Sequence, residues 1–285
     1  MPHFNKYINS KGLIHVGACG GGEYEHYVGL GIKHLIFFEP QQYWYDQLLK
    51  NQREILSKYS GRTTDYCIKV AVGNFNGSSE MYIADNGASS SLLEPKVHLI
   101  QHPEVLFNKT EIVPVIRLDD FWKTSNIEPT IFDTLVVDTQ GYELEVLRGA
   151  INTLKHINVC EIEVERVELY SGSAQIDQID KFFTEHGFQR RIVSWCGGTW
   201  GDAVYVKLES GNIERKMIEN LGLTYVNDHW CLKLSRNVKI HLFLYNNTCL
   251  LQIEDSDGKI VHEDLFLDYD DLITTFKTRV VECGG

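Results

Sequence analysis

Short apolar runs alternate with amphipathic stretches from residue 12 to about residue 207. The apolar runs predict five strands, GLIHVGA, HLIFFEP, DYCIKVAVGNFNG, TLVVD and NVCEIEVE. Apolar residues at helical spacing predict helices over residues 43–59 and 174–187, the second of which ends at Gly187. Strands that alternate with helices predict an α/β fold, in which a mostly parallel sheet is covered on both faces.

The later part of the chain departs from this alternation. Residues 189–196 and 202–208 predict an antiparallel pair of strands. The composition changes at residues 209–212, which predicts a linker between a domain of residues 1–208 and an accessory domain of residues 213–285. The accessory domain is expected to be a small α+β or antiparallel unit, with a short helix at 213–222 and a hairpin at Asp257-Gly258. Its role and the oligomeric state stay open.

The composition is that of an ordinary globular protein, with 43% apolar and 23% charged residues. The formal net charge of -12 disfavours a nucleic-acid partner, which would need clustered lysine and arginine. No apolar run is long enough to span a membrane, and the N-terminus lacks the apolar core of a signal peptide, so we expect a cytoplasmic protein. The seven cysteines include no C-x-x-C pair, which favours reduced thiols over a zinc site.

The stretch FDTLVVDTQGYELEVLRGA, residues 132–150, predicts a site. A buried strand delivers Asp138 to its C-terminal end, and Gly141 permits a tight turn into a helix whose apolar face is marked by Leu144, Leu147, Ile151 and Leu154. Ligands of open α/β sheets bind at the C-terminal ends of the strands. Asp138 is therefore expected to face a ligand.

A second signal follows the first predicted strand. Gly17, Gly20, Gly21 and Gly22 would let the backbone approach a cofactor, and Glu39 ends the next strand, where a carboxylate can accept hydrogen bonds from a ribose diol. This pattern fits a dinucleotide or S-adenosylmethionine (SAM). The spacing is not G-x-G-x-x-G, Glu23 and Glu25 crowd the loop, and Asp138 lies at the fourth strand, all of which favour SAM.

The motifs together resemble the FkbM-type family of SAM-dependent methyltransferases over residues 12–207. They are IHVGA, FFEP, AVGNFNGSSEM, NGASSSLLEP, VIRLDDF, VVDTQGYELEVLRGA, EIEVERVELYSG and WGDAVYVK. The resemblance implies a Rossmann-like methyltransferase sheet with an antiparallel final strand, SAM as methyl donor, and a hydroxyl acceptor on a sugar. Cys19 and His15 depart from residues common in the family. The implied cofactor-binding residues are Gly17, Ala18, Cys19, Gly20, Glu39, Pro40, Ala71, Val72 and Asp138.

Methyl transfer to a hydroxyl needs alignment of the acceptor and removal of its proton. Asp138 is the first candidate, as a base or as a ligand of a divalent cation such as magnesium, although it could instead cap the next helix. Glu143 and His98 are further catalytic candidates, with His102 as an alternative to His98.

The candidate substrate-binding residues are Ser89, Ser90, Ser91 and Glu163. Glu161, Glu163 and Glu165 share one face of the fifth strand, so we expect part of that face to open to a cleft. Trp200 could stack on a sugar ring, although core packing is the stronger expectation.

These observations predict a SAM-dependent O-methyltransferase that acts on a hydroxyl of a sugar, glycan or glycolipid precursor. One alternative is an NAD-dependent oxidoreductase on the same fold, against which the absence of a Y-x-x-x-K set in the later strands argues. The other alternative is a non-catalytic glycan-binding module. The identity of the acceptor and the need for a metal are not determined by the sequence.

Overall fold

The chain divides into two compact units, Met1–Lys207 and Leu208–Gly285. The computed structural model describes residues 10–59, 65–196 and 198–208 and, in the second unit, residues 224–226, 229–233, 239–245, 248–254 and 256–266. The predicted linker at 209–212 and the helix at 213–222 lie outside the described residues.

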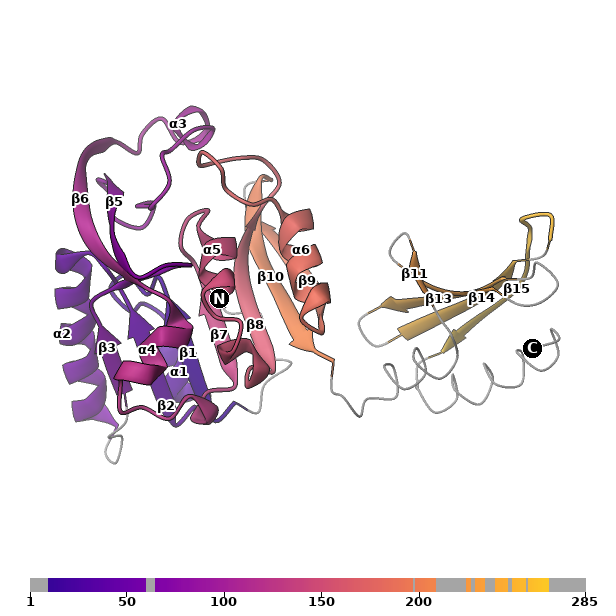
Figure 1. Ribbon diagram of the computed structural model, residues 1–285, viewed down its shortest axis with the longest axis horizontal. Coiled ribbons are helices and arrows are strands. Elements are labelled where there is room, and N and C mark those ends of the chain that lie inside the picture. Colours follow the sequence, from indigo (N-terminus) through magenta and orange to yellow (C-terminus); the bar gives the residue numbers. More distant parts are fainter. Residues whose placement is uncertain are drawn as a thin grey trace. The chain divides into compact units, whose positions relative to one another are not determined.

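The first unit is built on a seven-stranded sheet with the order β3-β2-β1-β7-β8-β10-β9 (Figure 1). Its strands are β1 (Gly12–Val16), β2 (His34–Phe38), β3 (Asp65–Ile68), β7 (Thr134–Val137), β8 (Val159–Glu165), β9 (Phe188–Cys196) and β10 (Trp200–Lys207). β10 pairs antiparallel with both β8 and β9, whereas β3, β2, β1, β7 and β8 are parallel to one another. The predicted α/β class and the antiparallel final pair are confirmed.

Helices cover both faces of this sheet (Figure 1). α1 (Tyr24–Gly29) and α2 (Gln42–Lys58) pack on one face, and α4 (Leu118–Thr124), α5 (Glu143–Arg148) and α6 (Ile176–Glu185) pack on the other. α3 (His98–Gln101) lies in the connection between β5 and β6, and 3-10 turns lie at Pro129–Ile131 and Thr153–Lys155. α6 ends as predicted, because Gly187 takes the left-handed conformation at φ +79°. α5 is shorter than predicted, since Ile151 and Leu154 lie beyond its last residue.

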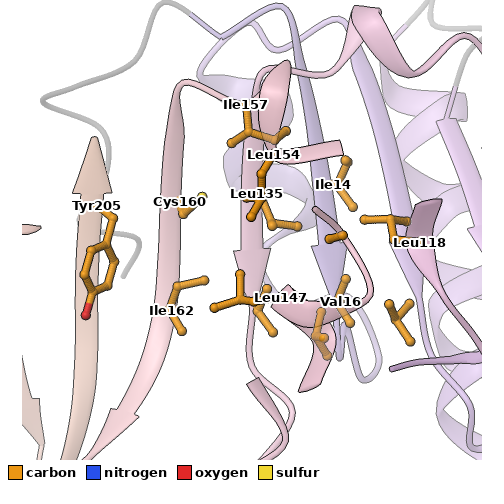
Figure 2. Packing of buried hydrophobic residues seen from close by; sticks show 14 of the residues in the cluster. Ile14, Val16, Leu118, Leu135, Leu147, Leu154, Ile157, Cys160, Ile162 and Tyr205 are labelled. Carbon is orange, nitrogen blue, oxygen red and sulfur yellow. The ribbon is translucent and has the colours of Figure 1, made fainter. Parts of the chain in front are cut away.

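Alternate residues of the inner strands supply two apolar cores. Ile14 and Val16 of β1 pack with residues of α4, α5 and α6 in one core, part of which Figure 2 shows. Leu13 lies in the other core, with Leu48 of α2. Each fully buried aliphatic side chain stabilises the fold by about 1.5–3 kcal/mol. The sheet is therefore fixed from both sides, and its C-terminal edge is left to the loops.

One predicted strand is wrong. The run DYCIKVAVGNFNG was expected to form a single strand, but it breaks between Ile68 and Ala71. The second half, β4 (Ala71–Val72), pairs with β6 (Phe107–Ile116), and β6 pairs with β5 (Gly77–Ala84) in a separate three-stranded sheet. A turn at the break, in which Val70 N donates to Ile68 O at 3.1 Å, sends the chain into this second sheet.

The described part of the second unit is an antiparallel five-stranded sheet with its strands in chain order. The strands are β11 (Thr224–Val226), β12 (His229–Lys233), β13 (Lys239–Tyr245), β14 (Thr248–Glu254) and β15 (Ile260–Phe266). The hairpin predicted at Asp257-Gly258 joins β14 to β15. Among the described helices of the whole chain, none is long and apolar enough to cross a membrane.

Candidate active site

The loop after β1 is held against the turn after β7. Gly17 N and Ala18 N both donate to Phe38 O, at 3.0 and 3.1 Å, and Asp138 N donates to Val16 O at 3.0 Å. Gly17 has φ +82°, and a Cβ atom there would lie 1.8 Å from the carbonyl oxygen of Asp138. The structure therefore requires this glycine for the contact between two loops of the protein, whatever else binds there.

Glu39 directly follows β2 and is only 3% exposed. Its two carboxylate oxygens each accept a backbone N–H, from Cys19 at 2.9 Å and from Gln41 at 2.8 Å. Burial raises the pKa of Glu39 to about 7, and the two backbone donors oppose that shift. A carboxylate oriented in this way keeps lone pairs for the two hydroxyl donors of a ribose, so the residues present fit the nucleoside part of SAM.

The turn after β7 joins two carboxyl groups through one amide. Gln140 Nε2 donates to Asp138 Oδ1 at 2.7 Å and to Glu163 Oε2 at 2.8 Å. The Tyr170 hydroxyl contacts Gln140 Oε1 at 3.1 Å and Ser89 O at 2.9 Å. Gln140 has a backbone φ of +56°, a conformation that residues other than glycine seldom adopt. All polar atoms of the Gln140 amide are thus used to orient neighbouring groups.

Both joined carboxyls hold protons more tightly than ordinary acids. Burial, followed by the charge of Asp202, raises the pKa of Asp138 to about 6, although hydrogen bonds from Gln140 and Glu163 oppose this shift. Burial and then the charge of Asp138 raise the pKa of Glu163 well above its usual range. Burial therefore favours the protonated form of both carboxyl groups relative to exposed acids.

Glu143 is held within the turn after β7. Its Oε1 accepts hydrogen bonds from Thr139 N at 2.8 Å, Thr139 Oγ1 at 3.0 Å and Gly141 N at 3.2 Å, and the residue is 3% exposed. This carboxyl therefore holds the turn that positions Asp138, and a catalytic role for Glu143 stays a prediction. Asp138 gives α5 no side-chain cap, so the capping interpretation of Asp138 is not supported.

Three cavities adjoin at the C-terminal edge of the sheet, and Asp138 and Ala88 line all three. The first, of about 670 Å³, we name the Trp44 cavity; Gly17, Trp44, Glu161 and Asp202 contribute to its walls. The second, of about 50 Å³, is the Glu39 cavity, lined also by Val70, Ala71 and Met81. The third, of about 350 Å³, is the His98 cavity, lined also by Glu163, Glu165, Tyr170 and Trp200.

The residues predicted to bind the cofactor gather around the first two cavities. Ala18 and Gly20 line the Trp44 cavity, and Gly17, Cys19 and Asp138 line both cavities. The remaining members, which line the Glu39 cavity, are Glu39, Pro40, Ala71 and Val72. Burial, with smaller contributions from nearby acids, raises the pKa of the Cys19 thiol to about 11, which disfavours the reactive thiolate form.

The predicted serine run separates into three environments. Ser89 lines the His98 cavity, and Ser90 lines the Glu39 cavity, where its Oγ lies 3.2 Å from Gln41 Oε1. Ser91 is fully buried, and its Oγ donates to Gln140 O at 2.7 Å. This hydroxyl therefore holds the turn after β7, and the role of Ser91 in substrate binding stays a prediction.

The acids of β8 are buried and line cavities, in agreement with the predicted cleft. Glu161, Glu163 and Glu165 are 8%, 9% and 2% exposed. Glu161 lines the Trp44 cavity, Glu165 the His98 cavity, and Glu163 both. Burial raises the pKa of Glu165 to about 7, because it disfavours the charged form.

The two predicted alternative bases and the indole lie together. His98 and His102 line the His98 cavity, with ring centroids 4.9 Å apart, and Trp200 lines the same cavity. Burial, followed by the neighbouring His102, lowers the pKa of His98. Within the described residues, no group of three His, Cys, Asp or Glu side chains is arranged to hold a metal ion.

Several residues of the site were not predicted. Gln140 was seen only as part of a turn, and Tyr170, Asp202 and Glu165 were not proposed as site residues. Asp202 lies opposite Glu163 across β8 and β10, a pairing that depends on strand order. The one local signal was the polar residue before Gly141, because a strand that ends in D-T-Q-G presents its side chains at the ligand edge.

The strand order and the acid at the end of β2 define a Rossmann-like cofactor-binding protein. The family model of the methyltransferase FkbM domain matches residues 15–190. The chain belongs to the FkbM methyltransferase family, and its cofactor is SAM, as the sequence motifs predicted. This membership decides against the NAD-dependent oxidoreductase.

A curated relative, the 2-O-methyltransferase NoeI of Sinorhizobium fredii (strain NBRC 101917 / NGR234), is 28% identical over 118 residues. The match covers 39% of this chain and 48% of NoeI, so the chain spans about half the length of this relative.

Two solved structures are similar in fold. The Streptococcus pneumoniae Sp1610 protein, a putative tRNA (m1A22) methyltransferase in complex with SAM, has a TM-score of 0.41 at 13% identity, covering 76% of this chain and 75% of its own. M. capricolum TrmK with S-adenosylhomocysteine has a TM-score of 0.42 at 12% identity, covering 75% of this chain and 71% of its own. Similarity at this level carries no argument about the acceptor.

Proposed function

We propose that this protein transfers the methyl group of SAM to a hydroxyl group of a sugar, with Asp138 as the base. The observation that carries the proposal is the position of Asp138 where the three cavities adjoin, with its Oδ1 held by Gln140. A cofactor on one side of Asp138 and an acceptor on the other side would bring their reacting atoms to the same carboxylate.

The cofactor side follows from the donors and the apolar walls. Glu39 would accept hydrogen bonds from the ribose, and Ala71, Val72 and Met81 would pack against the adenine. The positively charged end of SAM would enter the Trp44 cavity, where Glu161 and Asp202 offer negative charge. When bound, SAM supplies an electrophilic methyl group.

Asp138 would take the proton of the acceptor hydroxyl. A carboxylate with a pKa of about 6 is ionised at neutral pH and is a stronger base than an ordinary aspartate. Gln140 holds Asp138 Oδ1 and so fixes the orientation of the carboxylate. Burial raises the pKa of Glu163, which disfavours a second negative charge beside Asp138. The walls would hold the acceptor oxygen about 3–3.5 Å from the methyl carbon.

The choice of an oxygen acceptor is supported by the relative NoeI, whose name describes a 2-O-methyltransferase. The choice of a sugar is supported by the family resemblance of the motifs and by the polar and aromatic walls of the His98 cavity. A magnesium ion is not part of the proposal, because no group of three His, Cys, Asp or Glu side chains among the described residues is arranged to hold one.

Asp138→Asn tests the proposal. The amide keeps the shape but cannot accept the proton, so we expect kcat to fall by about 10²–10⁴-fold. The Kd of SAM should change little. Methyl transfer from labelled SAM to a panel of glycosides, together with calorimetric titration of SAM, measures both quantities. The control is Asp46→Asn, an exposed aspartate on α2.

Three outcomes would contradict the proposal. If Asp138→Asn keeps kcat within a few-fold of the parent, Asp138 is not the base. If the parent binds SAM but methylates no glycoside in the panel, the non-catalytic glycan-binding module is favoured. If activity requires added magnesium and is lost with EDTA, Asp138 acts with a cation and not alone.

A further inference from the structure

Two buried polar atoms of the His98 cavity have no hydrogen-bond partner in the described structure. They are Glu165 Oε1 and His98 Nδ1, and their residues are 2% and 5% exposed. Leaving such a group unpaired costs about 1–3 kcal/mol, so each needs an explanation. Neither atom is used by the proposed transfer of the proton to Asp138.

The surroundings of Glu165 leave only Oε1 for a ligand. Its other oxygen accepts hydrogen bonds from Ser173 Oγ at 2.5 Å and from Leu169 N at 3.1 Å. Trp200 is the Cα partner of Glu165 across β8 and β10, and both residues line the His98 cavity. A carboxyl beside an indole suits a sugar, because hydroxyls bond to the carboxyl while the C–H face of the ring packs on the aromatic surface.

His98 is held in place by aromatic neighbours. Its ring lies 5.4 Å from the Phe107 ring in an edge-to-face arrangement and 5.4 Å from the Tyr170 ring. These contacts fix the ring without using Nδ1. A neutral imidazole nitrogen can either accept or donate one hydrogen bond, so Nδ1 suits a hydroxyl equally well in both roles.

The charge of the walls restricts the ligand further. Glu104, Asp138, Glu163 and Glu165 line the His98 cavity, and no described residue of its lining is lysine or arginine. Its other histidine, His102, lies 3.5 Å from Glu104. Phosphate recognition normally relies on arginine, lysine or backbone N–H clusters, so these walls lack the cationic side chains that would bind a phosphorylated ligand.

We propose that the His98 cavity binds an uncharged pyranose ring: Glu165 and His98 hydrogen-bond its hydroxyls, Trp200 packs on its face, and sugar phosphates and nucleotide-activated sugars are excluded. The volume of about 350 Å³ lies within the range of small-ligand sites. The assignment deepens the proposed function, on which it rests for the role of the ring as methyl acceptor. Glu165 and His98 are then specificity-determining residues, and the acceptor is a finished glycoside rather than an activated sugar donor.

Saturation-transfer NMR on the full chain tests this inference, with and without saturating S-adenosylhomocysteine. The neutral probes are the methyl glycosides of glucose, galactose, mannose, xylose, fucose and N-acetylglucosamine. The charged probes are glucose 1-phosphate and UDP-glucose. We expect at least one neutral glycoside to bind and neither charged probe to do so.

Three variants locate the binding. Glu165→Gln keeps the shape but can place an amide nitrogen where Oε1 now lies, His98→Phe keeps the aromatic contacts but removes Nδ1, and Trp200→Ala removes the indole. Each variant should raise the Kd of the neutral glycoside that the parent binds most tightly by about tenfold or more. The control, Glu111→Gln, removes a carboxylate of β6 that pairs with Lys109 and should change nothing. Calorimetric Kd values for S-adenosylhomocysteine that match the parent's show that a variant is folded.

The results separate this inference from the proposed function. Glycoside binding that the three variants do not weaken, binding of none of the neutral probes, or preferred binding of a charged probe overturns the pyranose assignment, even if SAM is bound. Conversely, variant-sensitive glycoside binding without methyl transfer supports the cavity assignment and overturns the methyltransferase mechanism alone.

Discussion

The turns after β1 and β7 both orient carboxyl groups, but they use different hydrogen-bond donors. Each places a residue other than glycine in the left-handed region, Cys19 at φ 47° and Gln140 at φ 56°. Cys19 presents its backbone N–H to Glu39, whereas Gln140 presents its side-chain amide to Asp138 and Glu163. The cofactor side is thus organised by the main chain and the acceptor side by side chains.

This difference determines how well each side of the site should tolerate amino-acid substitutions. A backbone donor survives most substitutions of its own side chain, so Cys19 can depart from the residues common in the family while its N–H still reaches Glu39. The acceptor side depends on the identity of Gln140, Tyr170 and Ser91, which come from separate parts of the chain. We expect the cofactor side to be robust at Cys19 and fragile at Gly17, where the backbone itself makes the contact.

The largest effect is expected for Gly17→Ala. The methyl group would lie 1.8 Å from the Asp138 carbonyl oxygen, and the residue would be held at φ +82°. Backbone atoms cannot move aside as a side chain can, so the free energy of unfolding should fall by about 3 kcal/mol or more. Urea denaturation followed by tryptophan fluorescence measures it.

The same loop contains the matched control. A Cβ on Gly22 would meet nothing within 4 Å, so Gly22→Ala should change the free energy of unfolding by less than about 0.5 kcal/mol. Equal losses in the two variants would show that the loop needs glycine for flexibility rather than for the contact with Asp138.

The next largest effect is expected for Glu39, which tests the cofactor side of the comparison. In the ligand-free protein its pKa is about 7, whereas the ribose hydroxyls would favour the ionised form, so SAM should bind more tightly as the pH rises through about 7. Glu39→Gln should weaken the binding of SAM by about 10–100-fold at pH 8, because it removes hydrogen bonds to a charged acceptor. Calorimetric titration at several pH values measures the affinity.

The pH dependence is the discriminating part of this experiment. At pH 5.5 the parent carboxyl is mostly protonated and resembles the amide, so the parent and Glu39→Gln should approach each other in affinity. If the parent and Glu39→Gln differ in SAM affinity by the same factor at both pH values, Glu39 shapes the loop through Cys19 and Gln41 without contacting the ribose.

A smaller effect is expected on the acceptor side. The Gln140 hydrogen bond lowers the pKa of Asp138, so Gln140→Leu should raise that pKa above about 6. In the parent, kcat should fall as the pH drops through about 6, and in Gln140→Leu the fall should begin at a higher pH. The rate near neutral pH should drop by about tenfold as the base is no longer oriented. An unshifted midpoint with a lower plateau would leave Gln140 a purely orienting residue.

The sequence predicted features that depend on neighbouring residues. The strands β1, β2, β7, β8, β9 and β10, the end of α6 at Gly187, and the positions of Glu39 and Asp138 at strand ends were all indicated by local patterns. Periodicity was sufficient there because strands buried on both faces leave continuous apolar runs. The glycine loop was also located correctly, although the reason for Gly17 is a contact with Asp138 that no local pattern contains.

The remainder depended on pairings between distant residues. The three-stranded sheet was missed because β5 and β6 alternate weakly, and because Ile112 of β6 is 72% exposed where an apolar residue suggests burial. The three serines looked equivalent in sequence, yet the Ser91 hydroxyl donates a hydrogen bond to the backbone carbonyl of Gln140, 49 positions away. The strand period predicted that the acids of β8 share a face beside a cleft, but not that all three are buried, which depends on the elements packed around them.

Ala88 connects the two sides of this comparison. It has a single methyl group beside all three cavities, at the place where donor and acceptor would approach. A bulky residue there would act as a partition, separating compartments that now adjoin without disturbing the walls of either. If donor and acceptor bind as proposed, they would meet beside one of the smallest side chains in the chain, so a substitution at position 88 would alter the size of acceptor that fits.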